Sequence, residues 1–216
     1  MSTKIIKKNI YNIKIILLGE SGVGKTNLIN AYFGGNFNPE ILMTATPIQS
    51  HEKIEIKNNI CYIDIWDTMG HEQYRSITKT FIKGSHIIIF VYDITNKNTF
   101  TKLEYWVNKV NDEIDNDKII KGLAANKIDL FENSQVGKKE GEDYGKTIGA
   151  FFCETSAKED KKGFKEFVYK LVEKLLINED NIKKEGNIIE KNNDNFKIGE
   201  KKEEEKKEVP KKKNCC

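Results

Sequence analysis

Several features that mark other protein classes are scarce in this sequence. Arg75 is the only arginine, so a cluster of arginines for bidentate phosphate recognition is absent. The 36 lysine and arginine residues are nearly balanced by 33 acidic residues, which leaves a net charge of +3. That small charge argues against a nucleic-acid binder held by bulk electrostatics, because phosphate neutralisation needs a concentrated basic face.

Long hydrophobic runs are also missing. The longest nearly unbroken apolar stretch, Ile87 to Tyr92, is far shorter than the roughly 20 residues needed to cross a bilayer. The first residues contain lysines and no apolar core, so no secretory signal is expected, and residue 2 is not the glycine that myristoylation requires. Without an export signal, a disulfide framework is not expected and a reducing cytosol is. Cys61 and Cys153 lie in apolar runs and are expected in the core.

Composition divides the 216 residues into one domain of ordinary size and a tail. We predict an N-terminal extension at 1–10, a globular domain at 11–177 and a tail at 178–216. The tail contains lysines and acidic residues in near balance, and its segment 200–208 contains no apolar residue. Because such a tail buries too little surface to offset its ordering entropy, we expect it to be disordered. A short helix at 201–208 would not be stable alone.

Apolar segments alternate with segments of helical spacing in the predicted domain. Nearly continuous hydrophobicity predicts buried parallel strands at Ile13–Leu18, Ile60–Trp66, Ile87–Tyr92, Ile119–Ala125 and Ala150–Cys153. Alternating apolar and charged residues predict an antiparallel edge strand at Ile48–Lys57. Helices are predicted at Lys25–Phe33, Gln73–Lys83, Phe100–Ile114, Glu140–Ile148 and Gly163–Ile177. This order is typical of a doubly wound α/β domain with right-handed crossovers.

The segment Gly19 to Thr26, GESGVGKT, matches the phosphate-loop pattern G-x-x-x-x-G-K-[ST] at every fixed position and lies between a predicted strand and a predicted helix. Its glycines let backbone N–H groups converge on phosphate oxygens, and the helix N-terminus adds partial positive charge. Lys25 is expected to reach the β- and γ-phosphates, and the Thr26 hydroxyl to coordinate Mg²⁺. The motif predicts a nucleoside triphosphate without saying which one; a plain glycine-rich turn is the alternative.

Two further segments are candidates for sensing the metal and the γ-phosphate. Asp67 follows a predicted strand, at the edge where ligands of open α/β sheets bind, and its carboxylate can hold Mg²⁺ through a water. The Gly70 N–H can meet a γ-phosphate oxygen. Thr44 lies in a predicted loop, where its hydroxyl would complete the Mg²⁺ shell only when triphosphate is bound. An ordinary solvated loop threonine is the alternative there.

The tetrapeptide Asn126–Asp129, NKID, follows a predicted strand and is suited to reading a base. Asp129 can accept hydrogen bonds from the N1–H and the exocyclic amine of guanine, whereas adenine would leave that carboxylate unpaired. The asparagine would tie this segment to the phosphate loop, and the lysine stem would cover the ring face. The tetrapeptide 155–158, TSAK, would offer the Ala157 N–H to the guanine carbonyl. Taken singly, each tetrapeptide could be a surface turn.

With these residues assembled, the sequence resembles the Ras superfamily of small GTPases and, most closely, its Rab branch. The resemblance covers about Tyr11 to Ile177 and includes GESGVGKT, WDT-x-G-x-E-x-x-R, VYDIT, NKID and ETSAK at the family's spacing. It implies a P-loop NTPase of the small G-protein fold, with a six-stranded, mostly parallel sheet, one antiparallel edge strand and about five flanking helices. It also implies binding of GTP and GDP with Mg²⁺, and edge-on packing of Phe37 against guanine.

The resemblance assigns roles to single residues of this sequence. The nucleotide would be bound by Glu20, Ser21, Gly22, Val23, Gly24, Lys25, Thr26, Asn27, Phe37, Thr44, Asp67, Gly70, Asn126, Lys127, Asp129, Ser156, Ala157 and Lys158. The metal would be held by Thr26, by Thr44 and, through a water, by Asp67. Hydrolysis would depend on Lys25, Gly70 and His71.

The resemblance also implies where the protein acts. The terminal pair Cys215 and Cys216 is similar to the Rab double geranylgeranylation signal, and two lipids anchor stably where one binds membranes only marginally. Unmodified cysteines are the alternative. The implied partners are an exchange factor, a GTPase-activating protein, effectors at switch I and switch II, a Rab escort protein and a GDP-dissociation inhibitor. We expect a monomer without nucleic acid, cycling between the cytosol and the cytoplasmic face of an intracellular membrane in vesicle traffic.

The sequence departs from the family pattern at both switches. Residues 45–47, Ala-Thr-Pro, follow Thr44 where Rabs usually carry Ile-Gly, and Pro47 removes an N–H donor at the start of the edge strand. His71 stands where the family has a glutamine that orients the attacking water. We therefore expect slow intrinsic hydrolysis; an exposed histidine without a role is the alternative.

Three functions remain open from the sequence. The first is a regulated GTP switch on a membrane. The second is a GTP-binding scaffold with negligible hydrolysis, which His71 and the unusual switch I support. The third, a P-loop phosphotransferase or ATPase, is disfavoured by Asp129, whose carboxylate suits guanine.

Overall fold

The computed structural model describes residues 8–39, 48–68, 80–114, 119–160 and 162–194, and only the backbone of 179–194. The chain divides into two units, Met1–Asn178 and Glu179–Cys216. Within the part that the structure describes, no helix combines the length and the apolar character needed to cross a bilayer.

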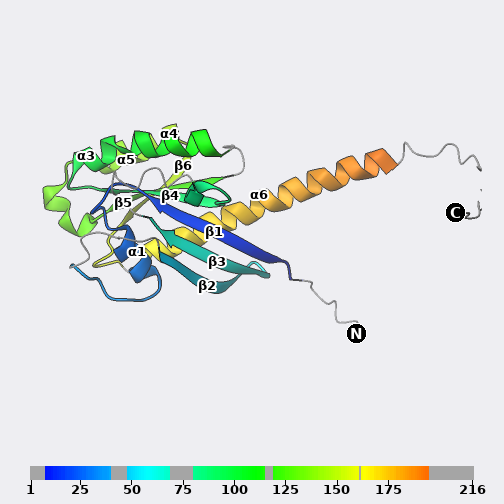
Figure 1. The fold of residues 1–216 in the computed structure, drawn as a ribbon, viewed down its shortest axis with the longest axis horizontal. Helices are drawn as coiled ribbons and strands as arrows, with labels where there is room; N and C mark the ends of the chain where they lie inside the picture. Colours follow the sequence, from blue (N-terminus) through cyan, green and yellow to red (C-terminus); the bar gives the residue numbers. More distant parts are fainter. Residues whose placement is uncertain (1–7, 40–47, 69–79, 115–118, 161, 195–216) are drawn as a thin grey trace, which may run out of the picture. The chain divides into compact units, whose positions relative to one another are not determined.

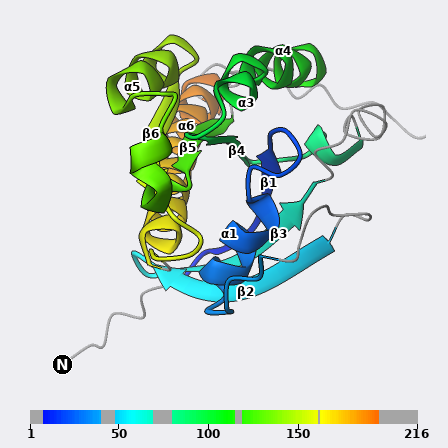
Figure 2. The ribbon, with the colours of Figure 1, turned by 90° about the vertical axis from the view of Figure 1, so that its left-hand side faces the viewer.

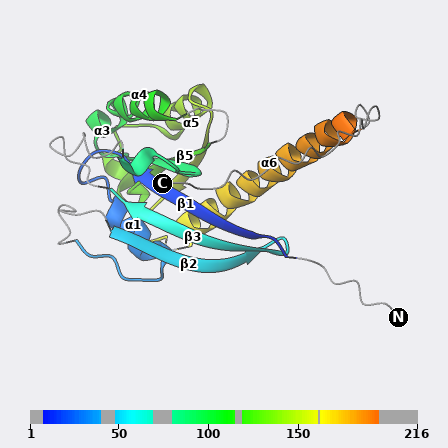
Figure 3. The same cartoon turned by 45° about the vertical axis from the view of Figure 1, so that its right-hand side comes forward.

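A six-stranded sheet forms the centre of the first unit (Figure 1). Its strands are β1 (Ile10–Leu18), β2 (Ile48–Ile56), β3 (Asn59–Asp67), β4 (Ile87–Asp93), β5 (Ile120–Asn126) and β6 (Ala150–Thr155). Their order in space is β2-β3-β1-β4-β5-β6, and every neighbouring pair is parallel except β2 and β3. Figure 3 shows β3 between β2 and β1. The predicted mostly parallel sheet with one antiparallel edge strand is confirmed.

Residue type explains where the strands lie in the sheet. All seven residues of β4, IIIFVYD, are buried, as expected for a central parallel strand covered on both faces. β2 alternates instead: Ile54 and Ile56 are buried, whereas Lys53 and Glu55 are exposed. Such alternation suits an antiparallel edge strand with one solvated face.

Helices cover both faces of the sheet (Figure 2). They are α1 (Lys25–Tyr32), α3 (Lys97–Thr101), α4 (Leu103–Glu113), α5 (Lys138–Thr147) and α6 (Gly163–Asp194), with a 3-10 helix at Ile128–Asn133. On one face, Leu28 of α1 and Phe164 of α6 share a buried cluster with Ile15; on the other, Trp106 of α4 shares one with Ile16. Because adjacent residues of a strand point to opposite faces, the consecutive isoleucines enter different cores.

Two helices begin earlier than predicted. The predicted helix Phe100–Ile114 is in fact two helices, α3 and α4, which meet at Lys102. Asn96 starts the first of them by accepting a hydrogen bond from the Asn98 N–H at 3.1 Å, a cap that apolar periodicity does not reveal. α5 begins at Lys138, two residues before the predicted start at position 140.

The backbone of α6 is helical through Asp194, whereas we predicted that this helix ends at Ile177 and that disorder follows. The predicted end of this helix at Ile177 is therefore wrong, whereas the disorder expected for the tail stays a prediction. Apolar periodicity stops near Ile177, but Glu179 and Asp180 each have a lysine four residues later, a spacing that stabilises a helix without any buried face. Residues 195–216 lie outside the described part, as does most of the predicted helix at 73–83.

Candidate nucleotide-binding site

The carboxyl ends of five parallel strands gather at one edge of the sheet, where ligands of open α/β sheets bind. β3 ends at Asp67, β4 at Asp93, β5 at Asn126 and β6 at Thr155, while the loop 19–24 follows β1. The strand register pairs Asp93 with Asn126, and Asn126 with Thr155. Motifs far apart in the sequence therefore meet at this edge.

Two glycines of the phosphate loop are required by close approach to the neighbouring strands. A Cβ at Gly19 would lie 2.2 Å from the carbonyl oxygen of Val91 in β4. Gly24, which precedes α1, has φ +97°, and a Cβ there would lie 2.4 Å from Asn126 Nδ2. A side chain at either position would push the loop away from the sheet edge, so glycine is dictated by space as well as by backbone conformation.

The Lys25 side chain folds back along its own loop. Its Nζ donates hydrogen bonds to the carbonyl oxygens of Gly19 and Glu20, both at 2.8 Å, and the residue is only 5% exposed. Burial lowers the pKa of Lys25 to about 8, while the negative charges of Asp67 and Glu20 act to raise it. Burial disfavours the charged form of Lys25, and the negative charge of a bound phosphate group would stabilise it.

Glu20 connects the phosphate loop to α4. One carboxylate oxygen accepts a hydrogen bond from Trp106 Nε1 at 3.1 Å, and the other accepts one from Lys102 Nζ at 3.0 Å. Because its carboxylate binds these two partners, the contribution of Glu20 to a nucleotide site would come from its backbone. Sequence analysis did not identify Trp106, because this residue lies 86 positions after Glu20 and no motif spacing connects the two.

Thr26 and Asp67 place a hydroxyl and a carboxylate side by side. Thr26 Oγ1 donates a hydrogen bond to Asp67 Oδ2 at 2.7 Å, and Asp67 is buried at the end of β3. A hydroxyl and a carboxylate are the hard oxygen donors that Mg²⁺ prefers, so these residues fit that ion. Among the described residues, no group of three or more His, Cys, Asp or Glu side chains is placed to hold a metal ion.

The buried Asn126 side chain joins three of the predicted motifs. Its Nδ2 donates a hydrogen bond to the carbonyl oxygen of Val23 in the phosphate loop at 2.7 Å. Its Oδ1 accepts a long hydrogen bond, 3.4 Å, from the N–H of Ala157 in the TSAK segment. A single amide therefore sets the spacing between the loop suited to phosphates and the two segments suited to a base.

The Asp129 carboxylate is held in place by the TSAK segment. Ser156 Oγ donates a hydrogen bond to Asp129 Oδ1 at 2.6 Å, and it accepts hydrogen bonds from the N–H groups of Lys158 and Glu159 at 3.2 and 3.0 Å. Ser156 is 1% exposed, so these hydrogen bonds are shielded from water. It fixes the direction of the carboxylate that we predicted to read guanine.

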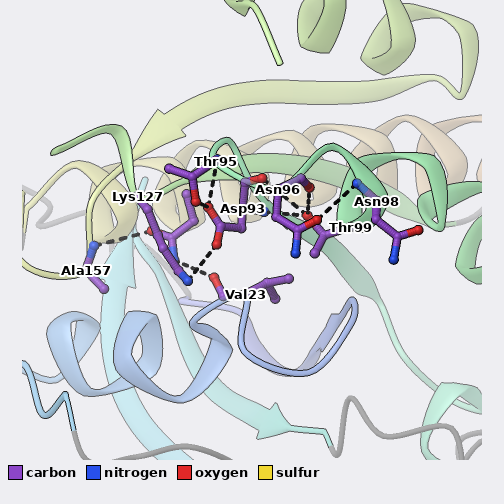
Figure 4. A network of polar contacts seen from close by, with 9 residues as sticks. Val23, Asp93, Thr95, Asn96, Asn98, Thr99, Lys127 and Ala157 are labelled. Atoms are coloured by element: carbon purple, nitrogen blue, oxygen red, sulfur yellow. Dashed lines mark hydrogen bonds and ion pairs between the residues drawn. The ribbon is translucent and has the colours of Figure 1, made fainter. Parts of the chain in front are cut away.

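Lys127 is paired with a residue that sequence analysis did not identify. Its Nζ lies 2.6 Å from Asp93 Oδ2, and Asp93 Oδ1 accepts hydrogen bonds from the N–H and the hydroxyl of Thr95 at 2.9 and 2.7 Å (Figure 4). Asp93 belongs to the VYDIT motif, to which we assigned no chemical role. Its place at the end of the strand next to the NKID strand is the signal that could have found it.

The Asn27 side chain fixes the segment that follows α1. Its Oδ1 accepts a hydrogen bond from the Asn38 N–H and its Nδ2 donates one to the Asn38 carbonyl oxygen, each at 3.0 Å. Phe37, which precedes Asn38, is 38% exposed and therefore accessible to a ligand.

The remaining predicted site residues fall into two groups. Ser21 and Gly22 lie at the exposed tip of the phosphate loop, where a ligand can reach them. The others lie outside the described part of the chain: Thr44, Gly70, His71, Cys215 and Cys216.

Comparison with known proteins gives a consistent result. The family model described as "Ras family" matches residues 14–177. The zebrafish (Danio rerio) Ras-related protein Rab-18-B is 36% identical over 167 residues, which cover 77% of this chain and 80% of that protein. Rab-18 of Caenorhabditis elegans is 36% identical over 77% of this chain and 81% of its own length. The maize (Zea mays) GTP-binding protein YPTM1 is 34% identical over 149 residues, 69% of this chain and 71% of that protein.

We predict that Asn126→Ala lowers the free energy of unfolding of the full chain by about 2–4 kcal/mol. The substitution leaves the Val23 carbonyl and the Ala157 N–H without their buried partner, and each such loss costs about 1–3 kcal/mol. Urea unfolding measures the change. Asn98→Ala, at an exposed position of α3, is the control and should stay within about 0.5 kcal/mol of wild type. Equal effects of the two substitutions would contradict the role given to Asn126.

Proposed function

The chain belongs to the Ras family of small GTPases, within its Rab branch, and we propose that it is a membrane-anchored switch that alternates between GTP-bound and GDP-bound states. As a member of this family, it binds guanine nucleotides, hydrolyses GTP and acts in membrane traffic. Its partners are regulators and effectors. In the proposal, residues 11–177 form the GTPase domain, and 178–216 form a tail that carries the anchor.

The observation that supports the nucleotide site best is the Asn126 amide, which connects the phosphate loop to the TSAK segment. In the proposal, Asp129 accepts hydrogen bonds from the N1–H and the 2-amine of guanine, and the Ala157 N–H donates to the guanine carbonyl. The Lys127 stem covers one ring face, and Phe37 packs against the ring edge. Adenine lacks both donors that Asp129 requires, so the site would reject it.

The phosphates would lie against the N–H groups of residues 20–24 and the N-terminus of α1, where partial positive charge favours anions. Lys25 would neutralise part of the β- and γ-phosphate charge. Thr26, Thr44 and, through a water, Asp67 would hold Mg²⁺. When bound, that ion screens the charge between the two terminal phosphates.

Thr44 and Gly70 would sense the γ-phosphate, because both can reach it only in the GTP-bound state. In that state switch I and switch II would be ordered for effectors, and after hydrolysis they would be released. His71 would position the attacking water less well than the glutamine usual in this family, so the GTP-bound state would be long-lived. A GTP-binding scaffold with negligible hydrolysis is the second candidate, favoured by the same histidine.

We predict that the full chain binds GDP and does not bind ADP. Asp129→Ala should weaken GDP binding by about 100-fold or more, because two hydrogen bonds to a charged acceptor are lost and each is worth about 1.5–3 kcal/mol. Equilibrium binding of fluorescent GDP and ADP analogues measures both affinities. Asp112→Ala, at an exposed position of α4, is the control and should bind GDP like wild type. Equal affinity of the wild-type protein for ADP and GDP would overturn the assignment.

We predict that His71→Gln hydrolyses GTP about tenfold faster than wild type in a single turnover. That factor corresponds to about 1.4 kcal/mol of better transition-state stabilisation by a well-placed hydrogen bond to the attacking water. His51→Gln, at an exposed position of β2, is the control and should hydrolyse at the wild-type rate. An unchanged or slower rate for His71→Gln would make the histidine an adequate substitute. Wild-type hydrolysis too slow to detect would favour the scaffold.

Membrane attachment would depend on Cys215 and Cys216, modified by two geranylgeranyl groups on the cytoplasmic face of an intracellular membrane. A Rab escort protein and a GDP-dissociation inhibitor would bind the lipidated tail in the cytosol. An exchange factor and a GTPase-activating protein would set the nucleotide state. The lysines at 211–213 would add attraction to anionic lipid, about 1 kcal/mol per charge at most.

We predict that a Rab-type geranylgeranyl transferase adds two groups to the wild-type chain, one to Cys216→Ser, and none to the double variant Cys215→Ser/Cys216→Ser. Intact mass counts the groups, and sedimentation with liposomes measures membrane binding. Since one chain anchors only marginally, the single variant should bind liposomes far more weakly than wild type. Transfer to the double variant would place the modification elsewhere.

A further inference from the structure

We propose that Asp93 is a positioning residue for guanine-nucleotide retention that acts through Lys127. Its carboxylate holds the Lys127 ammonium and thereby fixes the backbone of the NKID turn, which carries Asp129. The inference rests on the proposed nucleotide site, and it gives the VYDIT motif a physical role in that site.

The Asp93 carboxylate is itself immobilised. Asp93 is 6% exposed, and both of its oxygens are engaged: Oδ2 lies 2.6 Å from Lys127 Nζ, and Oδ1 accepts two hydrogen bonds from Thr95 (Figure 4). The backbone is fixed as well, because the Asp93 N–H donates a hydrogen bond to Thr99 Oγ1 at 3.0 Å. Because these hydrogen bonds fix the position of the Asp93 carboxylate, the carboxylate in turn fixes the position of the Lys127 ammonium that binds it.

This carboxylate comes from the strand next to the NKID segment. Asp93 ends β4 and is paired with Asn126, the last residue of β5, and the Ile94 N–H donates a hydrogen bond to the Asn126 carbonyl oxygen at 3.1 Å. Lys127 is the next residue along the chain. The hydrogen bonding of the sheet therefore places the Asp93 carboxylate beside the start of the NKID turn, within reach of the Lys127 side chain.

Lys127 adopts an unfavourable backbone conformation that its contacts must hold. Its φ is +67°, in the left-handed region that residues with a Cβ rarely adopt. From this conformation the Lys127 carbonyl oxygen accepts a hydrogen bond from the Leu130 N–H at 2.9 Å, which closes a turn that contains Asp129. Releasing the Lys127 side chain would let the turn relax and would move the Asp129 carboxylate away from a bound base.

Asp93→Asn tests the inference, because the amide keeps the shape and removes the charge. In the full chain we expect a fluorescent GDP analogue to dissociate about tenfold faster from this variant than from wild type. In a Lys127→Met background, which keeps the stem without the ammonium, the same substitution should accelerate dissociation by less than about twofold. Such dependence on Lys127 distinguishes positioning through the lysine from general structural damage, which would act equally in both backgrounds.

Glu52→Gln is the matched control. Its carboxylate lies 2.9 Å from Lys165 Nζ, so it also forms an ion pair with a lysine. Glu52 belongs to β2, which three strands separate from β5 in the order of the sheet, and therefore lies away from the NKID turn. The control should release GDP at the wild-type rate. Thr95→Val keeps Asp93 and removes one hydrogen bond to its Oδ1, so we expect about two- to fivefold faster release, again dependent on Lys127.

The outcomes separate the two proposals. If wild type does not retain GDP, the proposed function fails, and this inference fails with it. If wild type retains GDP but Asp93→Asn and Thr95→Val release it at the wild-type rate, or Asp93→Asn acts equally in both Lys127 backgrounds, this inference alone is wrong. Should Asp93→Asn fail to fold, Thr95→Val decides the matter.

Discussion

The side chain of Asn126 is the contact on which the geometry of the site depends. Its amide binds the Val23 carbonyl, 103 residues earlier in the chain, and the Ala157 N–H, 31 residues later. The close approach that forbids a side chain at Gly24 is to this same amide. One short polar side chain at the end of β5 therefore connects two loops to the NKID segment, and a neutral amide can do so because it both donates and accepts.

The fold could be predicted because its strands have distinct patterns. Ile87 to Tyr92 is apolar throughout and forms the fully buried β4, while the alternation around Ile54 and Ile56 marks the antiparallel edge strand β2. The phosphate loop could be predicted for another reason, since only glycine fits at two of its positions. Space against Val91 dictates Gly19, and positive φ together with the nearby Asn126 amide dictates Gly24.

The contacts that support the site could not be predicted, because they join residues without any fixed spacing. The Glu20 carboxylate accepts hydrogen bonds from Trp106 and Lys102. No sequence pattern connects Glu20 with these two residues, which lie more than 80 positions later. Asp93 belongs to the VYDIT motif, but only the register of β4 beside β5 shows that it lies next to Lys127. The end of α6 was also missed, because apolar periodicity stops near Ile177 while the next turn carries charge pairs at i, i+4, Glu179 with Lys183 and Asp180 with Lys184.

The contact between Glu20 and Trp106 has a spectroscopic consequence. The protein has two tryptophans, and both belong to segments of the site: Trp66 precedes Asp67 in β3, and the buried Trp106 donates its indole N–H to the phosphate loop. Indole emission depends on the hydrogen bonding and polarity around the ring. The tryptophan fluorescence of this protein therefore comes from two positions in segments of the site, and the emission of Trp106 can report the state of the phosphate loop without any attached dye.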